Sequence, residues 1–245
     1  MRRIFIGCYV HELPPLPPVD AIVAVDVIRA TTTAATALAQ GRRCFPAADI
    51  EDALSLASRL EHPLLAGELG GNMPYGFDLN NSPADVAART DVWRPMVLLS
   101  TSGTRLIRDA VARGVAVYAT CLRNYSAQID RLAERYESVA LLGAASRGEF
   151  REEDQLCCAW VADGLTQRGF SAMDGAGTIV ARWRAAPVDA IATGHSAEYL
   201  RNTDQLKDLR FILDHVDDIA SVFEISGDEL VSTSAAVPTR SLAAS

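Results

Sequence analysis

A carboxylate, a guanidinium and three hydroxyl groups lie within a stretch of eight residues near the start of the chain. Asp26 ends an apolar, β-branched run, Arg29 follows it, and Thr31, Thr32 and Thr33 open an alanine-rich segment. This order predicts a strand that ends at the first turn of a helix. Free N–H groups at that turn favour an anion, and the carboxylate can bind a cation. We therefore expect Asp26 and Arg29 to be catalytic and the three threonines to contact an anionic substrate.

Asp26 could act in two ways, and the residue types leave both open. It could coordinate Mg²⁺, or it could attack phosphorus and form an aspartyl-phosphate. Phosphatases of the haloacid dehalogenase type carry a second aspartate two positions later, where this chain has Ile28, so that type is disfavoured. Arg29 beside hydroxyl groups suits a bidentate clamp on phosphate, sulfonate or carboxylate oxygens.

Two further acids border a long loop. A predicted strand over 64–69 contains Glu68 near its end, and the glycine- and asparagine-rich loop over 70–83 contains Asp78. Loops of this length in compact domains are usually functional. Because Mg²⁺ needs only one or two carboxylates besides water and phosphate oxygens, Asp26 with one other acid suffices. We rank Glu68 above Asp78 as that metal ligand and count it as catalytic.

A second unit of strand, hydroxyl-rich turn and helix follows. The strand over 96–101 leads into Thr101, Ser102, Gly103 and Thr104. Their N–H and hydroxyl groups could bind another anionic group of the substrate. Simple capping of the next helix by Ser102 is an alternative of nearly equal weight.

Cationic and amide side chains follow two more predicted strands. Arg123 and Asn124 come after the strand over 115–120, and Arg147 comes after the strand over 138–146. If the ligand carries three acidic groups, at least one of these arginines should face the pocket and bind substrate.

Strands and helices alternate along the chain. Apolar runs predict strands over 4–10, 21–27, 42–47, 64–69, 96–101, 115–120, 138–146 and 218–225, and helical spacing fills much of the sequence between them. This alternation predicts an α/β protein, a three-layer α/β/α fold with a largely parallel or mixed sheet. Ligands of such sheets bind at the carboxyl ends of the strands, where Asp26, Glu68, Thr101 and Ser146 fall. We expect one domain over 1–230, which two α/β lobes could compose, and a partly ordered tail over 231–245.

Composition excludes several classes of protein. The 23 Lys and Arg against 31 Asp and Glu give a net charge of −8, so no nucleic acid or membrane partner is expected. Five cysteines in apolar surroundings suit buried thiols in a reducing compartment. The first apolar run meets His11 and Glu12 before it reaches the length of a signal peptide. We expect a cytoplasmic protein, and a homo-oligomer is compatible with these features.

Other chemistries lack their motifs. The chain has no Walker A sequence and no GxGxxG, and its four histidines show no metal-ligand spacing with the cysteines. The GHSAE segment at 194–198 is like a serine-hydrolase elbow, but Glu198 occupies the position that needs glycine. A serine esterase that acts through Ser196 is therefore disfavoured.

Five separated motifs occur in order within residues 20–165, namely DVIRATTT (26–33), GE (67–68), GFDLNNSP (76–83), STSGT (100–104) and GEFREED (148–154). Together they resemble the 2-phosphosulfolactate phosphatase family, the ComB-like proteins. The resemblance implies a magnesium-dependent acid phosphatase that acts on the small anionic substrate 2-phospho-3-sulfolactate, a step toward coenzyme M. It also implies Glu153 and Asp154 as further metal ligands, and Asn81 and Ser82 as substrate-binding residues.

Two positions depart from the family pattern. Ser102 stands where we expect asparagine in a TxNGT-type turn, and Asn80 stands where we expect glycine in a GFDxGNSP-type loop. Neither change removes a carboxylate, and the retained acids favour an enzyme. The contrasting hypothesis is a non-catalytic protein that binds an anionic metabolite on the same fold.

Overall fold

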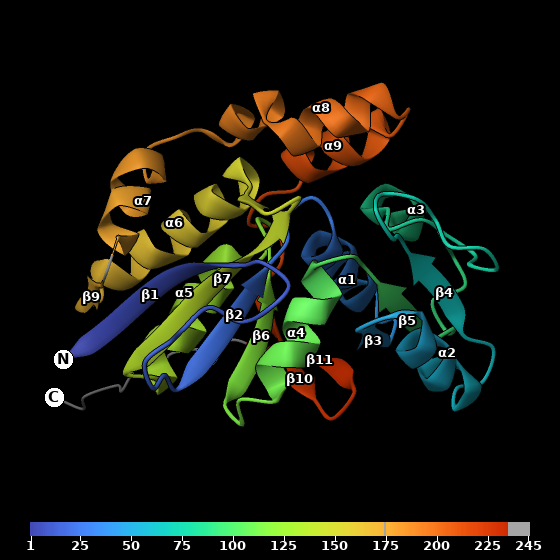
Figure 1. Cartoon of the computed structure of the whole chain (residues 1–245), viewed down its shortest axis with the longest axis horizontal. Helices are drawn as coiled ribbons and strands as arrows, with labels where there is room; N and C mark the ends of the chain where they lie inside the picture. The colour runs from blue at the N-terminus through green and yellow to red at the C-terminus, as the bar shows by residue number, and fades with distance from the viewer. Residues whose placement is uncertain (174, 235–245) are drawn as a thin grey trace, which may run out of the picture.

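The strands form one mixed sheet at the centre of the molecule (Figure 1). The computed structural model describes residues 1–173 and 175–234. The strand order within these residues is β4-β5-β3-β11-β10-β6-β2-β7-β1-β9, and β8 pairs with β7. The bounds are β1 (Arg2–Tyr9), β2 (Ala21–Val25), β3 (Cys44–Ala47), β4 (Leu64–Gly67), β5 (Met96–Leu99), β6 (Ala116–Thr120), β7 (Ser138–Ser146), β8 (Glu149–Phe150), β9 (Phe170–Ala172), β10 (Ser221–Ser226) and β11 (Glu229–Ser234).

An antiparallel hairpin joins two parallel groups of strands. Strands β4, β5 and β3 are parallel to one another, and so are β6, β2, β7, β1 and β9. The hairpin β10–β11 lies between the groups, with β10 antiparallel to β6 and β11 antiparallel to β3. The sheet is therefore mixed, and the predicted α/β fold class is confirmed.

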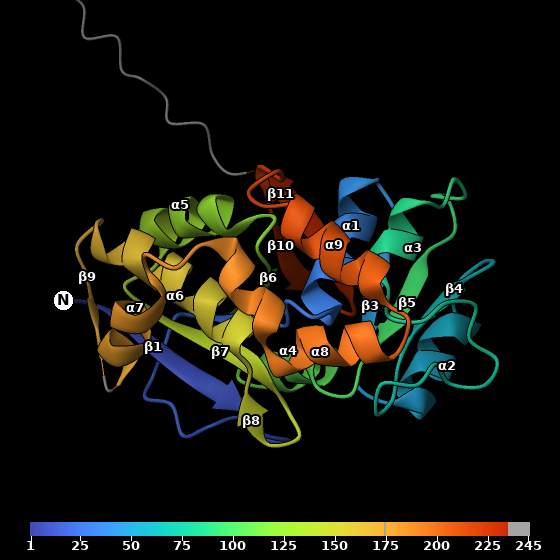
Figure 2. The ribbon, with the colours of Figure 1, turned by 90° about the horizontal axis from the view of Figure 1, so that it is seen from above.

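Helices cover both faces of the sheet (Figures 1 and 2). Helices α8 and α9 lie together across one end of the molecule, and α9 packs against α3. The bounds are α1 (Ala30–Ala39), α2 (Ile50–Ser58), α3 (Pro83–Ala87), α4 (Gly103–Val111), α5 (Tyr125–Arg135), α6 (Glu152–Thr166), α7 (Ala176–Trp183), the 3₁₀ helix η1 (Val188–Thr193), α8 (His195–Asn202) and α9 (Leu206–Asp214).

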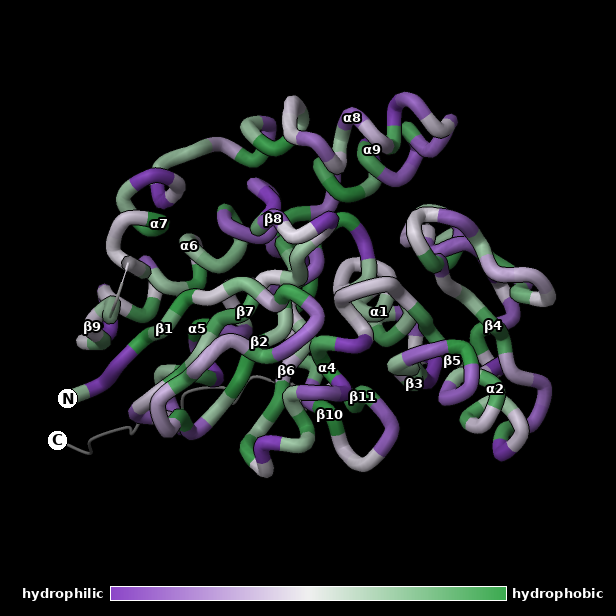
Figure 3. Tube along the Cα trace, in the orientation of Figure 1, coloured by the Kyte–Doolittle hydropathy of each residue, from purple (hydrophilic) through white to green (hydrophobic). Residues whose placement is uncertain are grey.

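Strand β2 shows why the strand before Asp26 reads as a continuous apolar run. Ala21, Val23 and Val25 pack into the core beneath α5 and α6, and Ile22 and Ala24 pack into the opposite core with α4. All five residues are fully buried. A central strand covered on both faces loses the alternation of polar and apolar residues, and Figure 3 shows β2 and β7 mostly hydrophobic along their length.

The predicted elements largely match, with corrections toward the C-terminus. Helix α6 begins at Glu152 and not after Asp154, and the preceding charged turn contains the short strand β8. Strand β9 and helix α7 lie in a segment for which the sequence predicted no element. The tail was expected from residue 231, but β11 continues to Ser234 because β3 and β10 supply its pairing partners. Residues 235–245 lie outside the described residues.

Two further features concern the state of the cysteines and the length of the apolar helices. All five cysteines are free thiols, and four of them are buried. No helix in residues 1–173 and 175–234 combines the length and apolar character needed to cross a membrane.

Candidate active site

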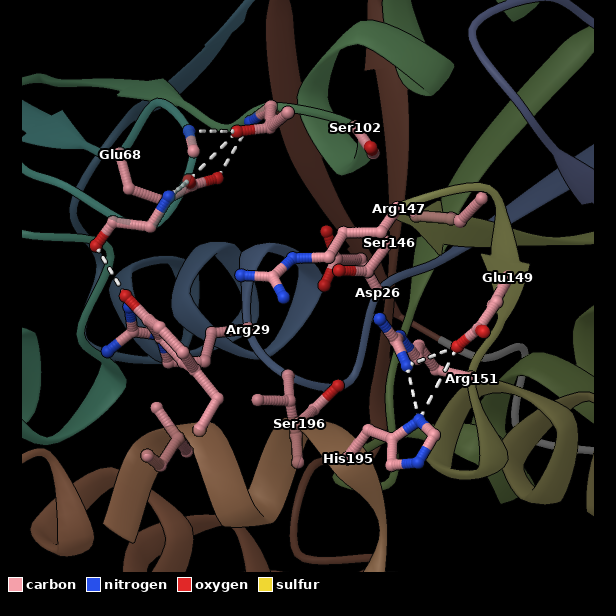
Figure 4. A pocket seen from close by; sticks show the side chains of 18 of the residues that line it. Asp26, Arg29, Glu68, Ser102, Ser146, Arg147, Glu149, Arg151, His195 and Ser196 are labelled. Carbon is pink, nitrogen blue, oxygen red and sulfur yellow. Dashed lines mark hydrogen bonds and ion pairs between the residues drawn. The ribbon is translucent and has the colours of Figure 1, made fainter. Parts of the chain in front are cut away.

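A cavity of about 730 Å³ lies where β2 and β7 end, between the loops after β4 and β5 and helix α8. Figure 4 shows Asp26, Ser146 and Arg147 near its centre, Glu68 and Ser102 along one side, and Arg151 with His195 along the other. The residues on its wall are His11, Asp26, Ile28, Arg29, Glu68, Gly70, Gly71, Asn81, Thr101, Ser102, Ala144, Ala145, Ser146, Arg147, Glu149, Arg151, His195, Ser196, Glu198, Tyr199, Leu200 and Asn202.

Asp26 occupies the turn between β2 and α1. The Thr31 hydroxyl donates to the Asp26 carbonyl at 2.8 Å and accepts from the Asp26 N–H at 3.0 Å, which holds the turn. Burial, and after it the charges of Glu68 and Glu153, raise the pKa of the Asp26 carboxyl to about 7, although the Ala30 N–H and Arg29 act in the opposite direction. Perturbation of this kind, by burial and by like charges at a cavity wall, is typical of active-site acids.

The first residue of α4 packs directly against Asp26. A Cβ atom added at Gly103 would lie 2.1 Å from Asp26 Oδ2 and 2.8 Å from Asp26 Cβ. Only glycine allows the STSGT turn to approach the carboxylate this closely. Gly103 does not line the cavity itself. Its role is to leave room for the Asp26 carboxylate, because it has no side chain.

We expect Gly103→Ala to lower kcat about 10- to 100-fold, because the new methyl group must displace the Asp26 carboxylate and a shift of about 1 Å can cost that much. The measurement is steady-state kinetics of the purified variant beside its thermal unfolding. Gly177→Ala is the matched control, since a Cβ atom there meets no atom within 4 Å. Wild-type kinetics in the Gly103 variant would contradict this account.

Glu68 connects the loops that follow β4 and β5. Its carboxylate accepts from the Thr101 N–H at 2.7 Å, from the Thr101 hydroxyl at 2.9 Å and from the Gly71 N–H at 2.7 Å. It thus shapes the wall that it lines and keeps capacity for one more partner, because a carboxylate can accept about four hydrogen bonds or ligand contacts.

Three arginines line the cavity. Arg29 is buried and donates through Nη1 to Asp208 at 2.7 Å and also to Gln205. Arg147 is exposed, and Figure 4 shows it beside Asp26. Arg151 is nine-tenths buried and its Nη1 lies 2.7 Å from Glu149 Oε2 and 2.8 Å from Nδ1 of His195. Three guanidinium groups around one cavity favour a ligand with several acidic groups.

The family model for 2-phosphosulpholactate phosphatase matches residues 10–227. The chain belongs to the 2-phosphosulpholactate phosphatase family. Membership confirms the resemblance found in the sequence, and it confirms the prediction of an enzyme that hydrolyses a phosphoric monoester.

Relatives match over most of their length. A protein of Synechocystis sp. is 32% identical over 217 residues, which cover 83% of this chain and 90% of the relative. One of Parasynechococcus marenigrum is 35% identical over 219 residues, covering 85% and 90%. One of Synechococcus sp. is 37% identical over 177 residues, covering 69% and 72%. All three are named as probable 2-phosphosulfolactate phosphatases.

The motifs of the phosphosulpholactate phosphatase family contribute unevenly to the cavity. Seven of the residues predicted from the sequence lie on its wall, namely Asp26, Arg29, Glu68, Asn81, Thr101, Ser102 and Arg147. Several other polar residues of the same motifs instead bond the protein's own backbone.

The threonines predicted to contact substrate are placed away from the cavity wall. The hydroxyls of Thr31, Thr32 and Thr33 donate to the carbonyls of residues 26, 27 and 29, and Thr104 bonds both the N–H and the carbonyl of Ser100. These four side chains are buried and absent from the cavity wall. They hold the strand-to-helix turns in shape, because a buried hydroxyl needs a partner and the turn carbonyls are nearest.

Ser82 and Asp78 also have structural contacts in place of the expected ligand contacts. Ser82 caps α3, and its hydroxyl donates to Asp208. Asp78 accepts from the Leu65 N–H at 2.9 Å and pairs with Arg94. Neither residue lines the cavity, so the structure does not bring Asp78 to the other proposed metal ligands.

Arg123 and Asn124 lie outside the cavity as well. Arg123 pairs with Asp218 at 2.6 Å and donates to the Thr36 hydroxyl, and Asn124 accepts from the Cys121 N–H. Strand β6, which precedes them, borders the antiparallel hairpin, and that position directs the following turn toward residues 217–221. Of Arg123 and Arg147, only Arg147 lines the cavity.

Glu153 and Asp154 form a buried acidic layer behind the cavity wall. Asp154 accepts from the Val27 N–H at 2.7 Å, and Glu153 Oε2 has no hydrogen-bond partner in the described chain. Burial raises the pKa of both carboxyls, and the charge of Glu153 further raises the pKa of Asp154 and of Asp26. Concentrated negative charge of this kind favours a proton or a cation among the carboxyls.

The sequence missed the contribution of α8 and of Arg151. His195, Ser196 and Tyr199 come from α8, and the Tyr199 hydroxyl donates to the Gly71 carbonyl at 2.9 Å across the cavity. The sequence suggested Ser196 only as an esterase nucleophile. Arg151 stands inside the GEFREED motif, whose position after a predicted strand was an available signal for a cation at the site.

Proposed function

We propose that this chain hydrolyses 2-phosphosulfolactate to sulfolactate and phosphate, and that it uses Mg²⁺. The observation that carries the proposal is one cavity whose wall holds the Asp26 and Glu68 carboxylates together with Arg29, Arg147 and Arg151. A phosphosulfolactate carries phosphate, sulfonate and carboxylate groups, which three guanidiniums can neutralise. The names of the relatives point to the same substrate.

The donor set fits Mg²⁺ better than a fully protein-enclosed metal. No group of three or more His, Cys, Asp or Glu side chains in residues 1–173 and 175–234 is arranged to hold a metal ion. Mg²⁺ needs only one or two carboxylates together with water and substrate oxygens. Asp26 and Glu68 would hold it, and when bound it would neutralise charge on the phosphoryl oxygens.

The chain's own residues account for binding and orientation. The guanidinium of Arg29 would bind phosphoryl oxygens, and the N–H groups of the turn at Ser102 would donate to a further oxygen. Arg147 and Arg151 would bind the two remaining acidic groups. Helix α8, fixed to the opposite loop through Tyr199, would limit the access of bulk water.

Asp26 has two available roles in the chemical step. As a nucleophile it would form an aspartyl-phosphate that water then cleaves, and as a base or metal ligand it would act on the attacking water. The stereochemical course at a chiral phosphorus separates these roles, because two successive in-line displacements through an aspartyl-phosphate retain the configuration and a single displacement by water inverts it.

The test is phosphate release from phosphosulfolactate, phospholactate and an aryl phosphate, each with Mg²⁺ and with EDTA. We expect the highest kcat/KM for phosphosulfolactate, and a rate at least about 100-fold lower in EDTA. Comparable rates in EDTA would overturn the metal requirement. Tight binding of phosphosulfolactate without any phosphate release would favour the binding-protein hypothesis, which no comparison supports.

A further inference from the structure

Asp208 of α9 is the centre of a buried network that contacts Arg29 from behind the cavity wall. Its side chain is fully buried, and its Oδ2 accepts from Arg29 Nη1 at 2.7 Å. Its Oδ1 accepts from the Ser82 hydroxyl at 2.6 Å and from the Ala84 N–H at 3.1 Å. Because a buried carboxylate is tolerated only when it is paired and hydrogen-bonded, these contacts define its position closely.

Gln205, one turn earlier in the chain, contacts the same atom of Arg29. Its Oε1 accepts from Arg29 Nη1 and also from the Nδ2 of Asn80 at 3.2 Å. Asn80 stands where the family pattern led us to expect glycine, and its Oδ1 accepts from the next N–H in the loop. The departure at Asn80 therefore adds a contact between the 70–83 loop and the network.

These contacts select one edge of the guanidinium. Nη1 carries two N–H groups, and Asp208 and Gln205 account for both. No residue of the described chain bonds Arg29 Nε or Nη2, and Arg29 lines the cavity. The Nε–H and one Nη2–H form a parallel fork, which is the geometry that binds two oxygens of a phosphate.

We propose that Asp208 and Gln205 are positioning residues that occupy Arg29 Nη1 and so direct its Nε/Nη2 edge at the phosphoryl group. The inference rests on the proposed phosphatase function and extends it to α9, which lies outside the recognised motifs. Without these acceptors the guanidinium can rotate and offer a different edge, so the cost falls on orientation and not on charge.

The central experiment compares Asp208→Asn with Asp85→Asn. Asp85 of α3 pairs with Lys207 of α9 at 2.6 Å on the surface, so its variant loosens the same two helices without touching Arg29. We expect D208N to lower kcat for phosphosulfolactate about 10- to 100-fold, and D85N to stay within about 2-fold of wild type. Equal losses in the two variants would overturn the inference.

A double-mutant cycle tests whether Asp208 acts through Arg29. If it does, D208N added to Arg29→Ala should change kcat by less than about 2-fold, although it changes kcat strongly in the wild type. A full further loss in the R29A background would overturn the inference. Should D208N fail to fold, Gln205→Leu removes one acceptor of the same Nη1 and is expected to lower kcat about 3- to 10-fold, and unchanged kcat there would count against us.

Binding of inorganic phosphate keeps this inference separate from the proposed function. Calorimetry should show phosphate affinity weakened about 5- to 10-fold in D208N and unchanged in D85N. If the wild type binds phosphate but hydrolyses no substrate, the proposed function fails while the positioning of Arg29 is still measured. If D208N binds phosphate like wild type and turns over normally, the positioning role fails while the function stands.

Discussion

Replacement of Asp26 by asparagine should lower kcat on the order of 10⁴-fold, the scale seen when an essential aspartate is removed from an enzyme. Both roles open to Asp26 require its charge, because an amide neither attacks phosphorus nor binds Mg²⁺ as a carboxylate does. The measurement is multiple-turnover phosphate release with saturating Mg²⁺. Activity above about one-hundredth of wild type would contradict the site.

The same variant should retain the fold, and its stability should respond to pH in a defined direction. In wild type the folded pKa of Asp26 is about 7 against an ordinary value of 3.8. The folded state therefore holds the proton more tightly than the unfolded state, and the free energy of unfolding falls as pH rises from about 4 to about 7. D26N lacks the titrating carboxyl group, so its free energy of unfolding does not show this fall.

In EDTA, urea unfolding should therefore show that the free energy of unfolding of D26N rises relative to that of the wild type between pH 5 and pH 8. The gain follows from the shifted pKa and is about 2 kcal/mol by linkage. A gap that stays constant or reverses would mean that Asp26 is ionised in the folded protein throughout this range. Chelation is essential to the comparison, because a bound cation would lower the same pKa.

Arg29→Ala should lower kcat about 10³-fold, the lower end of the effect of arginines that stabilise a transferring phosphoryl group. Arg29→Lys should recover little of it, since an ammonium cannot form the two parallel bonds of a guanidinium. R29A also leaves the buried Asp208 carboxylate without its partner, which should cost about 3–5 kcal/mol of unfolding free energy.

Arg123→Ala provides the matched control for this loss. Arg123 is also a buried arginine paired with an aspartate, but it lies outside the cavity. We expect it to lower the unfolding free energy while kcat changes by less than about 3-fold, because it makes no contact with the cavity wall. A large loss of kcat in R123A, with none in R29A, would exchange the roles assigned to the two residues.

The sequence predicted the part of the site that local pattern controls. Asp26 and Arg29 follow a continuous apolar strand, and parallel strands bring their carboxyl ends to one edge. The same reasoning did not predict that the hydroxyls of Thr31 and Thr33 donate to carbonyls of the strand-to-helix turn itself, although buried hydroxyl groups commonly bond nearby backbone.

The remainder depends on packing between distant segments, which a single sequence does not display. Asp208 meets Arg29 across 179 positions of the chain, and Tyr199 meets Gly71 across 128. Arg123 lies away from the cavity, and the strand before it pairs with the antiparallel hairpin, a neighbour that the sequence pattern did not predict. The GHSAE segment at the start of α8 is like an esterase motif and not a phosphatase one, so the place of this helix on the cavity wall could be found only from the fold.

The hairpin β10–β11 also has a consequence for how the protein is made. Asp26 follows a strand of one parallel group, and Glu68 and Thr101 follow strands of the other. During synthesis, residues 221–234 leave the ribosome after every other strand, and until they insert, β3 and β6 each present an unpaired edge. Until then the nascent chain holds two half-sheets with open edges, and the hydrogen-bonded pairing that joins the strand before Asp26 to the strand before Glu68 is incomplete.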